Sequence, residues 1–322
     1  MVEAFRIARY RFDLEAVDQL HMPAYQGSTL RGGFGHAFKQ IVCFQPDWRT
    51  CTPCARAQQC PYGYIFEARA PADQPGLHHL REIPPPFVIE ASSDAPRVYQ
   101  PGERLGFDVI LIGKAIGYLP YFMLAFQELG KAGIGRPAGR YVLQRISAVH
   151  PWRDERALVY DGVDMCAGAG LAASWADVSG WAATLPADQL TLHFLTPTRI
   201  KYQQSYVAQP AFHMLVRALL RRLSALALFY CGEAWAGDPR ALIAAAECID
   251  ATNLSVRWVD WDRFSGRQRQ RIELGGFVGE ATFRGDLAPF RAALALGALV
   301  HVGKATVFGH GHYVIGPPAT LP

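Results

Sequence analysis

The feature that most constrains the fold of this chain is an order of predicted strands and helices that the first half already completes. Alternating apolar and polar residues predict strands at 4–13, 87–92, 105–112 and 141–149. Apolar residues at helical spacing predict one helix at 28–42, capped by Ser28, and another at 116–131. The resulting order, β-α-β-β-α-β, is typical of the ferredoxin-like fold.

The second half repeats this order. Strands are predicted at 189–195, 253–262, 268–277 and 305–315, and helices at 212–230 and 286–298. A length of 322 residues also suits two domains. We therefore expect an α+β protein with tandem ferredoxin-like domains at 1–150 and 186–322, a linker at 151–185, and a cysteine-rich insertion at about 43–62.

Composition excludes several classes of protein. Half of the residues are hydrophobic and 19% are charged, which excludes intrinsic disorder. The N-terminal residues lack the apolar core of a signal peptide, and the longest apolar runs are shorter than the ~20 residues that span a bilayer. We therefore expect a cytoplasmic protein with no membrane partner. The net charge of +4 does not by itself indicate nucleic-acid binding.

Basic residues nevertheless gather in the second half. Between Asp188 and Glu233 there is no acidic residue, and the stretch contains Arg199, Lys201, Arg217, Arg221 and Arg222. Tyr202 and Tyr206, in the same stretch, are suited to stacking on bases. A second group surrounds a predicted hairpin and consists of Arg263, Arg267, Arg269 and Arg271, the last three on one face of a strand. The two groups favour RNA binding over an ordinary solvated surface.

A glycine-rich turn is predicted near the end of the chain. Its members are Gly303, Lys304, Gly309, His310 and Gly311. Glycine permits positive φ and close approach of a ligand to the backbone. Exposed N–H groups beside a lysine favour a phosphate-binding turn, and the alternative is a strand bulge or tight turn without a ligand.

Four of the seven cysteines are close together in the sequence. They are Cys43, Cys51, Cys54 and Cys60, with the spacing C-x7-C-x2-C-x5-C. Thiolates at this spacing can hold a structural zinc ion, and an iron–sulfur cluster is the less favoured occupant. The alternative is four unliganded thiols, or pairs that oxidise.

Four stretches of the sequence resemble a known family. The longest is GGFVGEATFRGDLAPFRAALALGALVHVGKATVFGHGHYVI (275–315), and the others are LTLHFLTPTRIKY (190–202), STLRGGFGHAFKQIVC (28–43) and LPYFMLAFQELGKAGIG (119–135). They are similar to the CRISPR-associated RAMP-superfamily endoribonucleases, which process precursor CRISPR RNA. The resemblance implies RAMP-type ferredoxin-like domains, CRISPR repeat RNA as substrate, and other CRISPR-associated proteins as partners.

The resemblance also implies cleavage without a metal or other cofactor. The 2′-hydroxyl attacks the adjacent phosphate and leaves a 2′,3′-cyclic phosphate and a 5′-hydroxyl. In relatives the catalytic histidine often lies on or just after the first helix, and His36 occupies that position here. Lys39 can share its helix face and stabilise the phosphorane, and Arg31 is expected to contact RNA from another face.

Alternatives remain for the site and for the function. A buried structural role is the alternative for His36, and a structural or merely RNA-contacting role is favoured for His21, His193, His213, His301, His310 and His312. A non-catalytic RAMP subunit would bind repeat RNA in an interference complex. A zinc module for protein assembly is a third hypothesis, from a different class.

Overall fold

The computed structural model describes residues 4–45, 51, 54–56, 59–68, 83–91, 97–166, 170–235, 237–265 and 270–316, with the backbone alone at 263–265 and 270–272. These residues form two compact units. The N-terminal unit comprises Arg6–Ala173 and Phe229–Gly232. The C-terminal unit comprises Met1–Phe5, Ser174–Leu228 and Glu233–Pro322.

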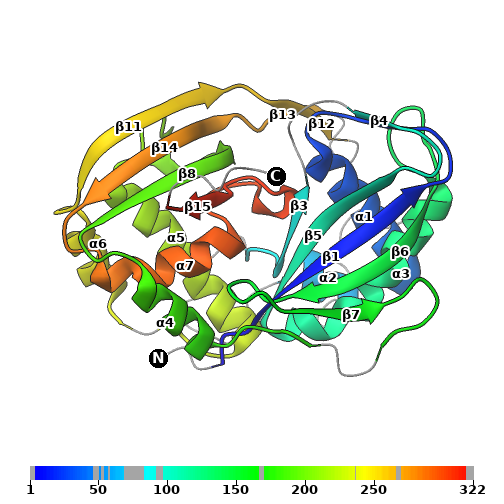
Figure 1. Cartoon of the computed structure of the whole chain (residues 1–322), viewed down its shortest axis with the longest axis horizontal. Helices are drawn as coiled ribbons and strands as arrows, with labels where there is room; N and C mark the ends of the chain where they lie inside the picture. Colours follow the sequence, from blue (N-terminus) through cyan, green and yellow to red (C-terminus); the bar gives the residue numbers. More distant parts are fainter. Residues whose placement is uncertain are drawn as a thin grey trace. The chain divides into compact units, whose positions relative to one another are not determined.

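In the N-terminal unit, five antiparallel strands form one sheet in the order β3-β5-β1-β6-β7 (Figure 1). The strands are β1 (Ile7–Ala16), β3 (Phe87–Ala91), β5 (Arg104–Ile112), β6 (Tyr141–Val149) and β7 (Arg156–Tyr160). Between β1 and β3 the chain forms helix α1 (Gln26–Val42), and between β5 and β6 it forms helix α3 (Leu119–Ala132). Apart from the added edge strand β7, this is the ferredoxin-like topology that the sequence predicts.

The core of this unit lies between the sheet and the two helices. Strand β1 alternates inward and outward, and its inward Phe12 is fully buried. Helix α1 contributes Phe34, whose ring stacks on Phe126 of α3 at a centroid distance of 4.9 Å. A Cβ at Gly33 of α1 would lie 2.6 Å from the side chain of Leu129 on α3. Glycine at this position therefore lets the two helices pack closely.

A short segment from late in the chain completes the N-terminal unit. Residues Ala227–Cys231 form a single π-helical turn, η2, and its Tyr230 is 1% exposed. The Tyr230 ring meets the Tyr64 ring edge-on at 5.4 Å. At Gly113, whose φ is 58°, a Cβ would lie 2.2 Å from the Tyr230 carbonyl oxygen. A turn flanked on both sides by sequence of the C-terminal unit thus packs into the N-terminal unit.

The C-terminal unit contains a four-stranded antiparallel sheet in the order β11-β14-β8-β15. The strands are β8 (Gln189–Thr198), β11 (Asp250–Val259), β14 (Gly276–Arg284) and β15 (Tyr313–Ile315). Helix α5 (Phe212–Leu226) follows β8, and helix α7 (Arg291–Val300) follows β14. The order again corresponds to the ferredoxin-like fold. The fold class is therefore confirmed in both halves.

Smaller elements fill the connections. In the N-terminal unit they are β2 (Leu20–Met22), α2 (Pro61–Phe66), β4 (Arg97–Tyr99) and η1 (Gly113–Tyr118). In the C-terminal unit they are α4 (Trp175–Thr184), β9 (Lys201–Tyr202), β10 (Ser205–Tyr206), α6 (Pro239–Ala246), β12 (Asp262–Ser265), β13 (Gln270–Glu273), η3 (Ala288–Phe290) and η4 (Thr306–Phe308). Strands β9 and β10 form one hairpin, and β12 and β13 form another. No helix among the described residues is long and apolar enough to cross a membrane.

Several elements differ from the prediction. Helix α1 begins at Gln26, so Ser28 lies inside it and does not cap it. The strand expected at 305–315 is a single 3-10 turn, η4, followed by the three residues of β15, because positive φ at Ala305, Gly309 and Gly311 interrupts the extended chain. The strand expected at 268–277 is divided between β13 and β14.

The segment 151–185 contains two ordered elements. Strand β7 pairs with β6 at the edge of the N-terminal sheet. Helix α4 begins with a capping box, in which the Ser174 side chain accepts from the N–H of Asp177 and the Asp177 carboxylate accepts from the N–H of Ser174. Such a box satisfies two N–H groups that the first helical turn leaves without partners, and so defines the start of the helix.

Candidate functional site

Helix α1 presents His36 to solvent. The opposite face of the helix is apolar and buries Leu30, Phe34 and Phe38 against the sheet and α3. His36 is exposed, although its neighbours Gly35 and Ala37 are buried. The helix therefore holds this imidazole on a rigid element and leaves it accessible to a ligand.

The two cations that flank His36 in the sequence both contact helix α2. The Lys39 ammonium lies over the Tyr62 ring, 5.5 Å from its centroid. The Arg31 guanidinium lies over the Phe66 ring at 5.0 Å. A cation over an aromatic face keeps its charge while its side chain loses freedom. These contacts place two positive charges at the α1–α2 contact.

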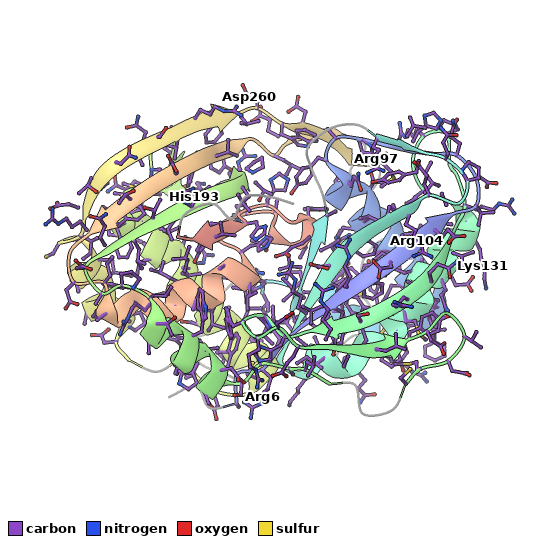
Figure 2. The ribbon with its side chains drawn as sticks, viewed as in Figure 1. Arg6, Arg97, Arg104, Lys131, His193 and Asp260 are labelled. Atoms are coloured by element: carbon purple, nitrogen blue, oxygen red, sulfur yellow. The ribbon has the colours of Figure 1, made fainter. Side chains whose placement is uncertain are left out.

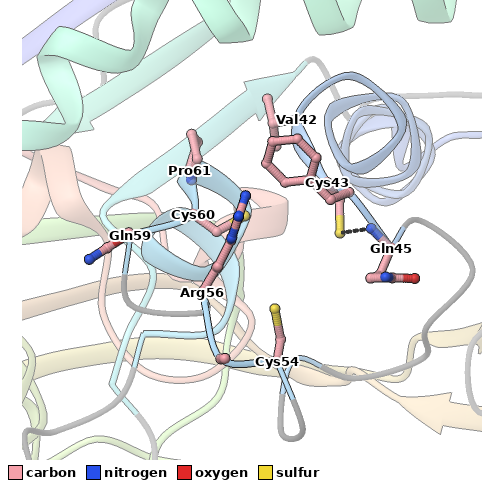
Figure 3. Close-up of a pocket in the computed structure, with 10 residues that line it drawn as sticks. Val42, Cys43, Gln45, Cys54, Arg56, Gln59, Cys60 and Pro61 are labelled. Atoms are coloured by element: carbon pink, nitrogen blue, oxygen red, sulfur yellow. Dashed lines mark hydrogen bonds between the residues drawn. The ribbon is translucent and has the colours of Figure 1, made fainter.

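The four clustered cysteines occupy the end of α1 and the segment that leads to α2. Cys43 is the C-cap residue of α1 and Cys60 is the N-cap residue of α2. Between them, the Cys54 N–H donates to the Cys51 carbonyl oxygen at 3.1 Å, which closes a turn. A pocket of about 750 Å³ is lined by Cys43, Cys54, Cys60 and Arg56 among others (Figure 3).

Cys51 is the most buried of the four, with 7% of its surface exposed. Its N–H donates to the Glu67 carboxylate at 2.9 Å. Burial raises the pKa of the Cys51 thiol to about 11, and Glu67, Cys60 and Cys43 add to the effect. None of the four clustered cysteines forms a disulfide bond.

In the C-terminal unit, the β9–β10 hairpin brings an aromatic ring against the start of α5. The Tyr202 ring lies 5.6 Å from the ring of His213, and the Arg217 guanidinium lies over Tyr202 at 5.6 Å. Lys201 and Arg221 are exposed beside them. We call these five residues the Tyr202 cluster. For His213 the sequence predicts a structural or merely RNA-contacting role, and its i, i+4 spacing to Arg217 places the two residues on one face of α5.

Two other arginines of the basic stretch make contacts within the protein. Arg222 is buried and its Nε donates to the Val300 carbonyl oxygen at 2.8 Å. The Arg199 guanidinium lies 3.8 Å from the Tyr206 ring centroid, and it donates to the Glu273 carbonyl oxygen. Its charge is partly balanced by the Glu273 carboxylate at 3.8 Å. Arg222 therefore supports the end of α7, and the exposed charge of this stretch is smaller than the sequence count.

The glycine-rich turn packs on the end of β8. The Lys304 N–H donates to the Arg199 carbonyl oxygen, and the Gly311 N–H donates to that of Pro197. At Gly303, where φ is 90°, a Cβ would lie 2.5 Å from the Arg199 oxygen. These glycines are thus explained by backbone packing, and both N–H groups donate within the fold. The Lys304 side chain is exposed.

Two histidines of this turn, His301 and His310, are buried, and His312 is half-buried. His310 is fully buried, with its Nδ1 3.2 Å from the Pro197 carbonyl oxygen. His301 is also fully buried, and its ring stacks on that of His312 at 4.7 Å. His193, labelled in Figure 2, lies on β8. Its Nδ1 lies 3.1 Å from the Glu280 carboxylate on the neighbouring strand β14. The exposed His36 differs from all of these in its accessibility.

Part of the predicted basic stripe cannot be placed. Arg267 and Arg269 lie outside the described residues. Arg271 is on β13, opposite Phe264 of β12, and its side chain is not described. RNA binding by these three arginines stays a prediction.

Comparison with known proteins gives two matching family models. Residues 192–313 match the model of the CRISPR-associated endoribonuclease Cas6. Residues 5–169 match the AF_1859_N family, an N-terminal domain. An uncharacterized protein of Archaeoglobus fulgidus is 26% identical over 149 residues, which is 45% of this chain and 46% of the relative. The matching part therefore spans about half the length of that curated relative.

Solved structures with a similar fold extend over nearly the whole chain. A Cas6 product complex has a TM-score of 0.57 at 18% identity, covering 96% of this chain and 99% of the other. Thermus thermophilus Cas6 has a TM-score of 0.54 at 16% identity, covering 97% and 99%. A partial Cas6-RT-Cas1–Cas2 complex has a TM-score of 0.59 at 13% identity, covering 98% and 47%.

The two family models take in both halves of the chain, and the solved structures share its tandem ferredoxin-like fold. By these matches, the chain belongs to the AF_1859_N family, whose model covers half of it, and its residues 192–313 match the model of the CRISPR-associated endoribonuclease Cas6.

Proposed function

We propose that this protein cleaves CRISPR repeat RNA in the precursor transcript without a catalytic metal ion, and that His36 acts as an acid or base in the reaction. The observation that carries the proposal is an exposed histidine on the first helix of a chain that matches the Cas6 model. The products are a 2′,3′-cyclic phosphate and a 5′-hydroxyl. Repeat RNA is the proposed partner, and the similar fold within a Cas6-RT-Cas1–Cas2 complex supports other CRISPR-associated proteins as partners.

The chemistry needs one group to take a proton and another to supply one. The 2′-hydroxyl loses its proton as its oxygen attacks phosphorus, and the 5′-oxygen gains a proton as the P–O bond breaks. An imidazole suits either step, because its unperturbed pKa of about 6.5 lets both protonation states exist near neutrality. The exposed position of His36 gives RNA access to its ring nitrogens.

Lys39 is the proposed source of positive charge for the phosphorane. It lies three residues after His36, which is close to one helical turn. The contact with Tyr62 restrains its ammonium group without neutralising it. A preorganised cation stabilises charge that develops in the transition state more effectively than a mobile one. Arg31, restrained in the same way by Phe66, is proposed to contact the RNA backbone.

The Tyr202 cluster is the proposed RNA-binding surface of the C-terminal unit. Lys201, Arg217 and Arg221 are exposed and would contact phosphates. Tyr202 offers a ring for base stacking, and His213 lies beside it. The exposed Lys304 of the glycine-rich turn is proposed to add a further phosphate contact.

The test is cleavage of a repeat RNA in EDTA by wild type, His36→Ala and His21→Ala. His21 is the control, because it lies in β2 and contacts Gln19 at 2.9 Å. We expect wild type and His21→Ala to cleave and to leave a cyclic phosphate, and His36→Ala to bind but to cleave at least about 100-fold more slowly.

The possible results separate the parts of the proposal. Wild type that binds repeat RNA but leaves it intact, with or without divalent metal, would be a non-catalytic subunit. Cleavage that requires a divalent metal contradicts the metal-independent mechanism. Cleavage by His36→Ala at the wild-type rate contradicts the role of His36 alone.

A further inference from the structure

We propose that Cys43, Cys51, Cys54 and Cys60 bind a metal centre through four thiolates, and that this centre ties the end of helix α1 to helix α2. The centre is structural and takes no part in RNA cleavage. The proposal therefore stands or fails independently of the proposed function.

The backbone brings the four cysteines to one place from three directions. Cys43 ends α1, and Cys60 begins α2. The Cys54 N–H donates to the Cys51 carbonyl oxygen, which brings these two residues together. Cysteines at C-x2-C spacing are common ligands of one metal ion in thiolate sites.

Side-chain positions agree with a shared site. Cys43, Cys54 and Cys60 line the same pocket (Figure 3). The buried Cys51 is joined to Cys54, which lines the pocket, by the hydrogen bond between the Cys54 N–H and the Cys51 carbonyl oxygen. All four are free thiols and do not pair as disulfides. A free, clustered set of thiols is the usual donor set for zinc and iron.

The charges around the pocket suit an anionic centre. Four thiolates around Zn²⁺ carry a net charge of −2, and an iron–sulfur cluster with four thiolates is also anionic. Arg56 lines the pocket and would offset this charge. The thiol protons pass to solvent when the metal binds.

The separation of the sulfurs bears on which metal they hold. Zn–S bonds of about 2.3 Å in a tetrahedron place the sulfurs about 3.8 Å apart. Among the described residues, no three of these cysteine sulfurs lie within 4.8 Å of one another. The sulfur atoms are therefore farther apart than in a closed zinc tetrahedron, so binding of a single zinc ion would require them to move closer to one another. An iron–sulfur cluster, whose thiolates bind different iron atoms, accommodates a wider set.

The consequence of this centre is a fixed contact between α1 and the short helix α2. Helix α2 has six residues, too few to be stable alone. Its Phe66 ring packs on Phe34 at 5.5 Å and on Phe38 at 5.4 Å, both on α1. A bond from Cys43 to Cys60 through the metal would fasten α2 at its first turn, and so would hold the rings over which Arg31 and Lys39 lie.

The experiment measures metal content in the full chain, purified without oxygen or chelators from cells supplied with zinc and iron. Zinc, iron and acid-labile sulfide are quantified for wild type, Cys54→Ser and Cys60→Ser. Cys248→Ser is the matched control, because Cys248 is exposed in the C-terminal unit. Circular dichroism checks that each variant is folded.

Stoichiometric zinc, or iron with sulfide and visible absorbance, in wild type and Cys248→Ser but not in the two cluster variants supports the proposal. The first result identifies a zinc ion and the second an iron–sulfur cluster. Wild type that contains neither metal, or cluster variants that are folded and retain it fully, would overturn the proposal. RNA cleavage by metal-free protein leaves the proposed function standing, and a metal-loaded protein that never cleaves RNA contradicts only that function.

Discussion

Gly311 offers a sharp test of whether the glycine-rich turn is explained by packing. Its φ is 73°, and a Cβ there would lie 1.9 Å from the Val302 carbonyl oxygen. That oxygen belongs to backbone, so the clash with Gly311→Ala cannot be relieved by a side-chain rotation. Moving the new Cβ away from the Val302 oxygen to an ordinary contact distance would disturb two backbone hydrogen bonds. In one the Val302 N–H donates to the Gly311 oxygen at 3.0 Å, and in the other the Gly311 N–H donates to the Pro197 oxygen at 3.1 Å.

The expected destabilisation follows from these two contributions. A non-glycine residue in the left-handed region costs about 1–2 kcal/mol. Two weakened hydrogen bonds add about 0.5–1.5 kcal/mol each. Gly311→Ala should therefore lower the free energy of unfolding of the C-terminal unit by about 2–5 kcal/mol.

The control is Gly316→Ala, because Gly316 also has a positive φ, 102°, but nothing lies within 4 Å of its Cβ position. It should lose only the conformational part, about 1–2 kcal/mol. Urea unfolding, with the transition of each unit fitted separately, measures both values. If Gly311→Ala is no less stable than Gly316→Ala, the packing explanation of the turn is refuted. RNA affinity per folded molecule should be the same for the two variants.

Two further predictions concern charge. Arg217→Ala should weaken RNA binding and reduce the slope of log affinity against log salt by about 0.7–0.9. The control Lys131→Ala removes an exposed cation of α3 and should leave this slope unchanged. Equal slopes for Arg217→Ala and wild type would mean that the Tyr202 cluster does not contact phosphate. Hydrogen bonds from Arg140 lower the pKa of Asp18 from 3.8 to about 2, so the stability from this pair is complete above pH 3.8 and is lost as the pH falls through about 2. The Tm gap between wild type and Asp18→Asn should accordingly close over that range, and a gap that does not vary with pH would contradict the assignment.

The strands and helices of the core could be predicted because their residues follow a single period. Strand β1 alternates buried and partly exposed residues from Ala8 to Ala16, and α1 buries residues at helical spacing. The expected strand at 305–315 failed for a local reason. Its apolar residues suit a strand, but positive φ at Ala305 and at two glycines bends the chain. The carbonyl groups of Pro197 in β8 and of Arg199 just after β8 accept hydrogen bonds from the bent segment.

The candidate site could be predicted only in part. The position of His36 on a helix followed from the apolar spacing around it, and its exposure agrees with the expectation of an accessible imidazole. Counting charges could not show that Arg222 is buried against a carbonyl oxygen, since the sequence does not distinguish a solvated guanidinium from one that caps a helix. The contacts of Arg31 and Lys39 with α2 are contacts between two separate helices, and residue spacing within a helix does not predict which residues of another helix it will meet.

The path of the chain around Tyr230 limits how this protein can be divided. A cut after Ala173 would separate most of the two units, but it would leave the N-terminal fragment without the segment Phe229–Gly232 that packs within it. Tyr230 packs against Gly113 and the Tyr64 ring, so its removal would expose both to water. The two halves are thus not interchangeable modules, and any recombination of them with other proteins must carry this tyrosine along.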